Sequence, residues 1–529
     1  MGGDTEHFDV VQVGFGPVGQ VSAAALGRLG HRVGVFERFG GLYALPRAGH
    51  VDHEVMRGFQ SIGAVEKMLD DAFRCSKYSW RNQHAQTLLD IDWSYDGISG
   101  WASDYLIYQP YVEDALNQAV RRQPSVAVHH GWSAVGVEQG DDWVEVELAQ
   151  GVLEETGYRL TGERRRVRGR YLVGADGANS VVRSLSGIAM VDRGFNEQWL
   201  VTDFRQKMPL HFEFDNGQIC DPTRPMCLFQ LGQTHRRFEF MVMPGDDVAE
   251  ITSPDRVWSL VSRWLTPEQA ELIRATVYTF RSASAEQWRS GRSLLIGDAA
   301  HLMPPFLGQG MSSGVRDAIE LAWKLDLVLN GKASDRLLDT HMIERRPHVD
   351  AITDQAVALG KVSCTIDPVA AAARDQAFFS GNVPPPPPFP ILEAGVLDDG
   401  SGPANAAVRG RLGPQGIIRT DAGEGLADDV IGSGWQLISR RDIVSSAQPR
   451  TRDILKELDV RLLNMGEGAG RVSDVNGTYT AYLDDAQALA VLVRPDFYVY
   501  GAVEADEPLD RLVDGLAAKL MLREPAVQA

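Results

Sequence analysis

A glycine-rich turn at Gly14–Gly19 constrains the fold of this chain more than any other feature. Its sequence, Gly-Phe-Gly-Pro-Val-Gly, follows an apolar stretch over Phe8–Val13 and leads into a run of small residues over Val18–Leu29. These patterns predict a strand, a tight turn and a helix. A second apolar stretch, Arg32–Phe36, predicts another strand that ends at Glu37. The order strand, helix, strand predicts an α/β fold with a parallel sheet.

The spacing of the glycines predicts a dinucleotide site at this turn. The first glycine, Gly14, permits the tight turn, and the second, Gly16, lets the backbone approach a pyrophosphate. The third, Gly19, allows helix and strand to pack closely, while the helix N-terminus faces the anion. Glu37, 23 positions after the first glycine, is placed to accept a hydrogen bond from a ribose hydroxyl. An ordinary glycine-rich turn is the alternative, which the flanking strand and helix disfavour.

Two later segments also run from an apolar strand into a polar turn. Tyr171–Gly174 is followed by Asp176-Gly177, and a helix capped by Asn179 or Ser180 explains much of that segment without a ligand. Ser293–Ile296 is followed by Gly-Asp-Ala-Ala-His, whose aspartate is Asp298. A carboxylate at the end of a buried strand needs partners to stay charged. A helix N-cap is the other interpretation of this aspartate, and it is compatible with cofactor binding.

With these three motifs in this order, the chain resembles the FAD-dependent aromatic hydroxylases of the para-hydroxybenzoate hydroxylase type. Within that family it is most similar to the 3-(3-hydroxyphenyl)propionate hydroxylases and related phenol and polyketide hydroxylases. The resemblance covers roughly residues 8–370. The segments that carry it beyond the glycine motif are Leu45–Ala48, Gln109-Pro110, Gly297–His301, Pro304-Pro305, Gly308–Met311 and Arg316–Ala318.

The resemblance implies a FAD site built from these segments. Asp298 would bind the ribityl chain, and the backbone N–H groups of Met311 and Ser312 would lie near flavin O2. A helix N-terminus carries partial positive charge, which suits an anionic reduced flavin. Arg47 would contact the phosphates or the ribityl chain through its planar fork, unless it is an ordinary surface arginine. The predicted cofactor-binding residues are Gly14, Gly16, Pro17, Gly19, Glu37, Arg38, Arg47, Gln109, Asp298, Pro305, Gly308, Gly310, Met311 and Ser312.

The reaction that the resemblance implies is hydroxylation of a phenolic or related aromatic substrate. NADPH or NADH would reduce FAD, O2 would form a flavin C4a-hydroperoxide, and the substrate would receive one oxygen atom. The protein must then position the ring, exclude water and favour the phenolate. His50 and His211 are candidates for the base, although a lone histidine is more often structural. The sequence assigns no catalytic residue and no metal site. A same-fold enzyme that inserts oxygen beside a ketone and a non-catalytic flavin-binding protein are the alternatives.

The length of 529 residues predicts more than one domain. We expect a Rossmann-like FAD-binding monooxygenase domain over residues 1–380, interleaved with a β-sheet substrate domain. The segments at about 72–105 and 190–280 are rich in aromatic residues and in strand-like alternation, which predicts the sheet that covers the substrate.

Composition changes after the first domain. Five consecutive prolines, Pro384–Pro388, predict a stiff linker within residues 381–400. A new strand and helix pattern appears over residues 401–529, and it ends in a predicted last helix with Leu509, Leu512, Val513, Leu516 and Leu520 on one face. This pattern corresponds to the thioredoxin-like domain of relatives. It holds no C-x-x-C pair, which excludes thiol redox activity and leaves a structural role or a homodimer contact.

Charge and cysteine content limit the partners. Lys and Arg number 52 against 71 Asp and Glu, so the formal charge of −19 disfavours binding to nucleic acid or to an anionic membrane. Four cysteines without a C-x-x-C pair are typical of reduced thiols in a cytoplasmic protein. The partners that the family resemblance implies are a small aromatic substrate and O2.

Overall fold

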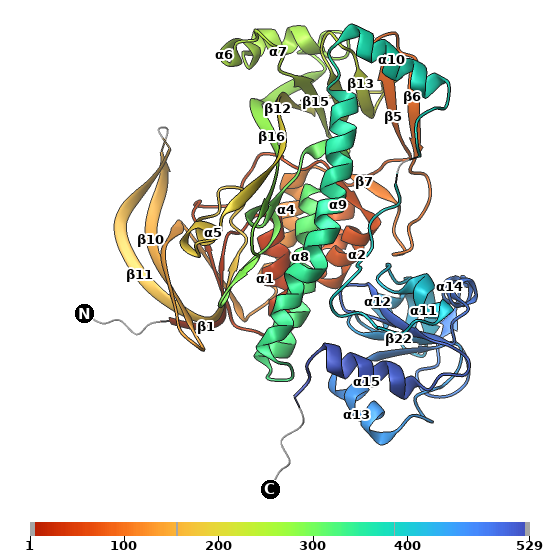
Figure 1. The fold of residues 1–529 in the computed structure, drawn as a ribbon. Coiled ribbons are helices and arrows are strands. Elements are labelled where there is room, and N and C mark those ends of the chain that lie inside the picture. The colour runs from red at the N-terminus through yellow and green to blue at the C-terminus, as the bar shows by residue number, and fades with distance from the viewer. Residues whose placement is uncertain (1–5, 155–156, 386, 524–529) are drawn as a thin grey trace.

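The glycine-rich turn lies at the carboxyl end of the first strand of a mixed sheet (Figure 1). The computed structural model describes residues 6–154, 157–385 and 387–523, so Pro386 of the predicted linker lies outside the described residues. The sheet has the order β17-β18-β11-β1-β2-β8, and β10 and β9 extend it from β11. Its strands are β1 (Glu6–Val13), β2 (Val33–Glu37), β8 (Val126–His130), β9 (Trp132–Gln139), β10 (Val144–Glu154), β11 (Gly157–Gly174), β17 (Arg289–Ser290) and β18 (Ser293–Leu295).

The predicted strand, turn, helix and strand at the start of the chain are confirmed. β1 pairs in parallel with both β2 and β11, and α1 (Pro17–Arg28) follows the turn. Helices α4 (Gln109–Arg121) and α8 (Gly310–Leu329) pack against α1. Small buried residues such as Ala23 and Ala24 let these helices approach one another.

A second sheet carries the aromatic-rich segments. Its order is β19-β16-β12-β15-β14-β13-β5-β6, and α7 (Pro254–Val261) packs on β16 at its outer end, beside α6 (Val248–Ile251). The strands are β5 (Lys77–Asn82), β6 (Thr87–Asp92), β12 (Met190–Gln206), β13 (Gly217–Cys220), β14 (Met226–Leu231), β15 (His235–Met241), β16 (Ala270–Ala285) and β19 (His301–Leu302).

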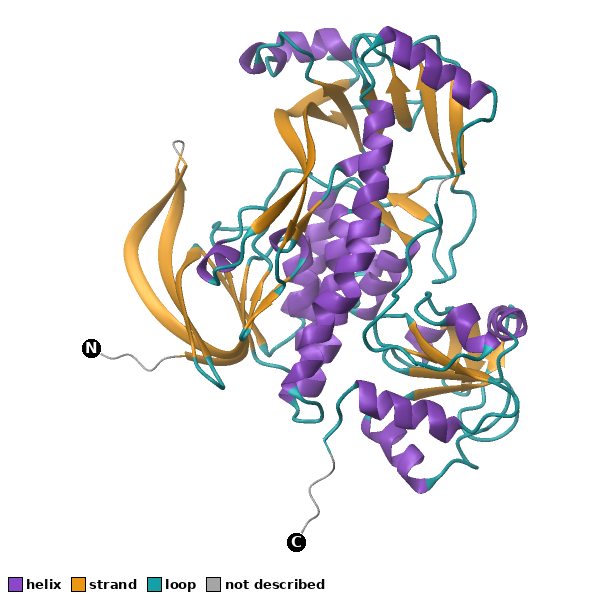
Figure 2. Cartoon of the chain, in the orientation of Figure 1, coloured by secondary structure: helices purple, strands orange, loops and turns teal. Residues whose placement is uncertain are grey.

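A small sheet and a long helix connect the two large sheets. β7 (Asp104–Leu106) pairs with both β3 (His50–Asp52) and β4 (Phe73–Arg74), so β4 and β7 belong to this small sheet rather than to the second sheet. β3 leads into α2 (His53–Ser61) and then α3 (Val65–Leu69). The long helices α8 and α9 (Thr340–Ser363) cross the middle of the molecule (Figure 2), and α10 (Pro368–Phe379) then packs near β6.

The C-terminal domain is a second α/β unit with its own sheets. One has the order β23-β22-β25-β26, in which β22 and β23 are parallel and the other pairs antiparallel. The predicted last helix is confirmed as α15, whose buried side chains include Leu512, Val513 and Leu516. The elements are α11 (Pro403–Val408), β20 (Ile417–Thr420), β21 (Gly423–Leu426), α12 (Ala427–Val430), β22 (Gln436–Ser439), α13 (Pro449–Glu457), β23 (Arg461–Asn464), β24 (Ser473–Asp474), α14 (Thr478–Ala486), β25 (Ala490–Val493), β26 (Val499–Val503) and α15 (Leu509–Lys519).

Among the described residues, no single helix has both the length and the apolar composition to span a membrane. One bent pair, formed by residues 335–363 and 368–379 with 115° between its halves, meets those two criteria only when taken together.

Candidate active site

A cavity of about 1530 Å³ reaches from the glycine-rich turn to the second sheet. This volume exceeds the roughly 300–1,000 Å³ of most single-ligand pockets, so a dinucleotide and a small aromatic molecule can share it. Most of the predicted site residues line it, but Gly19, Ser312 and His211 do not. The predicted residues on its wall are Gly14, Gly16, Pro17, Glu37, Arg38, Arg47, His50, Gln109, Asp298, Pro305, Gly308, Gly310 and Met311.

The three glycines of the turn differ in what surrounds them. Gly14 has φ +103°, and a Cβ atom there would lie 2.3 Å from the carbonyl oxygen of Ala175. A Cβ atom at Gly19 would lie 2.5 Å from the carbonyl oxygen of Gly14. At Gly16, a Cβ atom would meet no protein atom within 4 Å. The fold itself therefore requires the first and third glycines, whereas the second borders open space.

Glu37 holds the turn in place. Its two carboxylate oxygens accept hydrogen bonds from the backbone N–H groups of Phe15 (2.8 Å) and Phe39 (3.0 Å). Each oxygen keeps a further lone pair, so the predicted bond from a ribose hydroxyl remains feasible. Arg38 is exposed, with its guanidinium 4.7 Å from the centre of the Phe39 ring.

Gln109 positions the segment that carries Arg47. Its side-chain oxygen accepts from the backbone N–H groups of Arg47 (2.9 Å) and Ala48 (2.6 Å), and its Nε2 donates to Glu113 (2.6 Å). The other oxygen of Glu113 is buried without a partner. Burial raises the pKa of Glu113 to about 7. The guanidinium of Arg47 lies 4.5 Å from the centre of the Tyr43 ring, and the side chain is exposed toward the cavity.

The Asp-Gly segment lies on the same cavity wall. The predicted helix cap is confirmed at Ser180, whose Oγ accepts from the N–H of Arg183 (2.9 Å) at the start of α5 (Val181–Leu185). Asp176 accepts hydrogen bonds from the N–H groups of Val181 (2.7 Å) and Val182 (3.0 Å). These bonds explain the local structure without a ligand.

Asp298 and the N-terminus of α8 form the deepest part of the predicted flavin site. Asp298 lies in a 3₁₀ turn, and its position deep in the protein raises its pKa, although its side chain is open to the cavity. No side chain caps α8, because Gln309 instead donates to Asp52 (2.9 Å) and accepts from Arg316 (2.8 Å). The hydroxyl of Ser312 is buried without a partner.

These features fit the predicted cofactor. An uncapped helix N-terminus and a wide glycine turn offer backbone N–H groups to anionic groups. A carboxylate open to the cavity suits the hydroxyl groups of a ribityl chain. The donor set therefore fits a flavin dinucleotide.

His50 lies beside the loop that precedes α8, residues 304–309, which we call the cofactor loop. It forms a pair with Asp104. Its Nε2 lies 2.7 Å from Asp104, and its Nδ1 lies 3.5 Å from the carbonyl oxygen of Gly308. Burial would lower the pKa of His50, but the Asp104 carboxylate outweighs burial and raises it. The ring stacks on Trp93 with 5.4 Å between ring centres. In contrast, His211 is exposed in the loop between β12 and β13.

The second sheet contributes an aromatic and largely buried wall. The hydroxyl of Tyr78 accepts from Gln218 (3.2 Å) and lies 3.2 Å from Sγ of Cys227. Trp199 and Phe280 pack with Phe306 of the cofactor loop. Such a lining excludes water from the space beside the loop.

Several residues that line the cavity belong to no sequence motif, so sequence reasoning did not single them out. Asp104, Trp93 and Glu239 belong to segments predicted only as sheet. Glu113 carried a signal, since it stands four residues after Gln109 and therefore on the same face of the helix.

Comparisons with known proteins agree with this geometry. The family model described as FAD binding domain matches residues 7–356, and the HcaD C-terminal domain model matches residues 410–519. The chain is 39% identical over 528 residues, 98% of this chain and 96% of the relative, to a probable NADH-specific resorcinol 4-hydroxylase of Rhodococcus jostii (strain RHA1). This chain belongs to the FAD-dependent aromatic hydroxylases.

Further relatives of this hydroxylase span its full length. It is 32% identical over 542 residues, 97% of this chain and 95% of the relative, to the 3-(3-hydroxy-phenyl)propionate/3-hydroxycinnamic acid hydroxylase of Klebsiella pneumoniae. The fold matches aklavinone-11 hydroxylase, solved with FAD and aklavinone, with a TM-score of 0.77, 24% identity and coverage of 98% and 100% of the two chains. The hydroxylase is thus a flavin-dependent monooxygenase that binds FAD, consumes NAD(P)H and acts on an aromatic substrate.

Proposed function

We propose that this hydroxylase oxidises an uncharged phenol of the resorcinol type with NADH as the electron donor, and that His50 is the base that removes the phenolic proton. The observation that carries the proposal is the buried His50–Asp104 pair beside Gly308, on the wall of the cavity. The cofactor-binding residues named above would hold FAD.

Bound FAD supplies the redox chemistry, taking hydride from the nicotinamide and delivering one oxygen atom from O2 to the ring. The protein supplies the proton transfer. In neutral His50, Nε2–H donates to Asp104. Nδ1 lies 3.5 Å from the Gly308 carbonyl oxygen, too far for a strong hydrogen bond, so it can keep the lone pair that accepts the phenolic proton. Asp104 then balances the charge on the imidazolium, and the carbonyl group of Gly308 is an acceptor for the new Nδ1–H. The phenolate that forms has a more electron-rich ring than the neutral phenol, so it accepts an electrophilic oxygen atom more readily.

Charge on the second sheet favours an uncharged substrate over an arylpropionate. The buried guanidinium of this sheet that lines the cavity, Arg237, already donates to Asp203 (2.7 and 3.2 Å) and to the carbonyl oxygens of Pro46 (3.0 Å) and Arg47 (2.6 Å). Glu239 is buried beside it, 3.6 Å away. A substrate carboxylate placed here would meet a neutralised cation and a second carboxyl group.

One further cation on this sheet, Arg281, lines the cavity, but its side chain is exposed. Ion pairs at such positions contribute little. The names of relatives support both substrate classes, since one is a probable resorcinol 4-hydroxylase and another acts on 3-(3-hydroxy-phenyl)propionate. NADH is proposed because the first of these is named NADH-specific.

Steady-state kinetics on the FAD-loaded protein test the proposal. We expect kcat/KM for resorcinol to exceed that for 3-(3-hydroxyphenyl)propionate by at least about tenfold, the discrimination that 1–3 kcal/mol of pocket contacts usually provides. Hydroxylated product must be quantified together with NADH oxidation, because NADH can also be oxidised without hydroxylation of the substrate. A preference for the arylpropionate would overturn the substrate assignment, and hydroxylation unaffected by the change His50→Ala would overturn the role of His50.

We also propose that residues 401–529 form a thioredoxin-like domain, joined to a monooxygenase domain over residues 1–380 by a linker over 381–400. The support is connectivity, because β22, α13, β23, α14, β25, β26 and α15 give the β-α-β-α-β-β-α order of that fold, interrupted only by β24, which pairs in the other sheet of the domain. Cytoplasmic location, lack of nucleic-acid or membrane partners and a homodimer remain proposals. The charge of −19 supports the lack of nucleic-acid and membrane partners, and the free state of all four cysteines supports a cytoplasmic location.

A further inference from the structure

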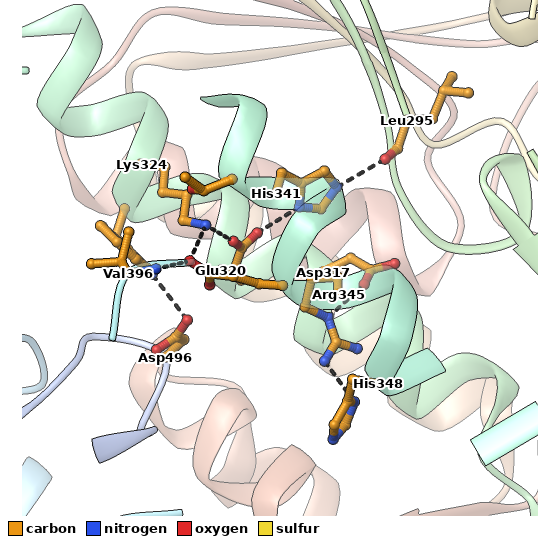
Figure 3. A network of polar contacts seen from close by, with 12 residues as sticks. Leu295, Asp317, Glu320, Lys324, His341, Arg345, His348, Val396 and Asp496 are labelled. Atoms are coloured by element: carbon orange, nitrogen blue, oxygen red, sulfur yellow. Dashed lines mark hydrogen bonds and ion pairs between the residues drawn. The ribbon is translucent and has the colours of Figure 1, made fainter. Parts of the chain in front are cut away.

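A buried chain of ion pairs joins the C-terminal domain to the helices behind the cofactor loop (Figure 3). Arg494, directly after β25, donates to Glu344 of α9 (2.5 Å) and to Asp496 (3.0 and 2.6 Å). Glu344 pairs with Lys324 of α8 at 3.0 Å. Lys324 pairs in turn with Glu320, one helical turn earlier in α8. All five side chains are buried, so their charges must be neutralised within the protein.

The chain continues through His341 to the strand that precedes Asp298. Nδ1 of His341 lies 2.5 Å from Glu320, and Nε2 lies 3.1 Å from the carbonyl oxygen of Leu295. Because both ring nitrogens face acceptors, both carry a proton and the ring is an imidazolium. Burial would lower the pKa of His341, but Glu320 outweighs it and raises the pKa. Leu295 ends β18, three residues before Asp298.

A second branch holds the first turn of α8. Asp317 accepts from the backbone N–H of Gly297 (3.0 Å) and from Arg345 of α9 (2.9 Å). Arg345 also donates to the carbonyl oxygen of Ser313 (3.3 Å). Asp317 thus holds Gly297 directly, and Glu320 holds Leu295 through His341. Two carboxylates of α8 therefore fix the short segment that precedes Asp298.

Charge balance in the first branch depends on the C-terminal domain. Three carboxylates, those of Asp496, Glu344 and Glu320, face three cations, those of Arg494, Lys324 and His341. Without Arg494, Glu344 keeps the backbone N–H of Val396 (2.7 Å) and the ammonium group of Lys324 as partners, and it then competes with Glu320 for Lys324. Glu320 then no longer holds the His341 ring in the orientation that directs Nε2–H toward the carbonyl oxygen of Leu295.

We propose that Arg494 is a positioning residue through which the C-terminal domain sets the FAD affinity of the first domain. It acts by holding Lys324 and His341 in the arrangement that fixes the segment before Asp298 and the adjacent start of α8. This inference rests on the proposed contacts of Asp298, Met311 and Ser312 with FAD. It gives the C-terminal domain a function that requires no thiol chemistry.

Arg57 offers a matched control at the same domain boundary. It lies on α2, is fully buried, and donates to Asp428 (2.7 and 3.1 Å) and to the carbonyl oxygen of Gly413 (3.1 Å). These partners belong to the C-terminal domain, so Arg57→Met removes an interdomain ion pair of the same type without changing the pairs of α8 and α9. It reports the effect of weaker domain docking alone.

The test is titration of the apoproteins with FAD, read by quenching of flavin fluorescence, with urea unfolding measured in parallel. We expect Arg494→Met to raise the Kd for FAD about tenfold, a typical coupling between two sites. Arg57→Met should stay within about twofold of the native Kd, the usual limit of independence between distant sites. The double variant Arg494→Met with Glu344→Gln should return to within about twofold, because it also removes the α9 carboxylate that would compete with Glu320 for Lys324.

The inference is overturned by an unchanged Kd in Arg494→Met, by an equal rise in Arg57→Met, or by a double variant that does not recover. If Arg494→Met does not fold, Arg494→Lys replaces it, because lysine keeps the charge but cannot reach Glu344 and Asp496 with one planar fork. A native Kd for Arg494→Lys would then refute the inference. Gly16→Val is measured in the same titration. If it leaves the Kd for FAD unchanged, the proposed FAD site itself is wrong; if it raises the Kd while Arg494→Met does not, only the coupling is wrong.

Discussion

The open space at Gly16 leads to a prediction that separates cofactor binding from folding. Gly16 has φ −71° and ψ −177°, a conformation that any L-residue adopts, and a Cβ atom there meets no protein atom within 4 Å. Gly16→Val should therefore change the free energy of unfolding of the apoprotein by less than about 0.5 kcal/mol, as at an unconstrained surface position. The same side chain would occupy the space assigned to the FAD pyrophosphate. Overpacking costs about 1–3 kcal/mol, so the Kd for FAD should rise about 5- to 150-fold.

Gly19→Ala is the matched contrast in the same turn. Its Cβ atom would lie 2.5 Å from the backbone oxygen of Gly14, so α1 must shift, and we expect a loss of about 1–3 kcal/mol in stability before any cofactor is added. Urea unfolding of both apoproteins and FAD titration of both give four measurements. The reasoning is refuted if Gly16→Val binds FAD with the native Kd, or if both variants lose the same stability.

Three further predictions concern titratable groups of the site and its support. His50→Ala should lower kcat by about 10²- to 10⁴-fold near pH 7, and stopped-flow turnover should recover toward pH 10, where a phenol ionises unaided; flat pH dependence would contradict this. Asp104→Asn should move the acidic limb of the kcat/KM profile to lower pH, because the carboxylate raises the pKa of His50 and the base is lost as pH falls through that pKa; an upward shift would contradict it. Glu113 has a pKa raised to about 7, so native stability declines as pH rises from the ordinary glutamate range to about 7. Apo Glu113→Gln should gain stability over the native protein at pH 8 but not at pH 4.5, and an equal difference at both pH values would count against it.

Patterns confined to short stretches were predictable from the sequence. The strand, turn and helix around Gly14–Gly19, the cap at Ser180 and the last helix depend on neighbouring residues, so spacing alone was sufficient to place them. Most of the predicted cofactor residues line the cavity, and those of the glycine-rich turn lie at the carboxyl end of β1, as the motif predicts. Ser312 was predicted to contact the flavin through its backbone N–H group at the start of α8, and its side chain is buried there and does not line the cavity.

By itself, the sequence determined the α/β fold, the dinucleotide turn and the family, because periodicity and glycine spacing reflect local backbone constraints. Only the tertiary structure decided which charges meet. His50 and Asp104 are 54 residues apart, and Arg494 and Glu344 are 150 apart. Neither pair lies in a motif, and a buried charge selects its partner by position in the folded core, where an uncompensated charge is costly. Of the two candidate bases, only His50 lines the cavity, whereas His211 does not, and this difference also depends on the tertiary fold.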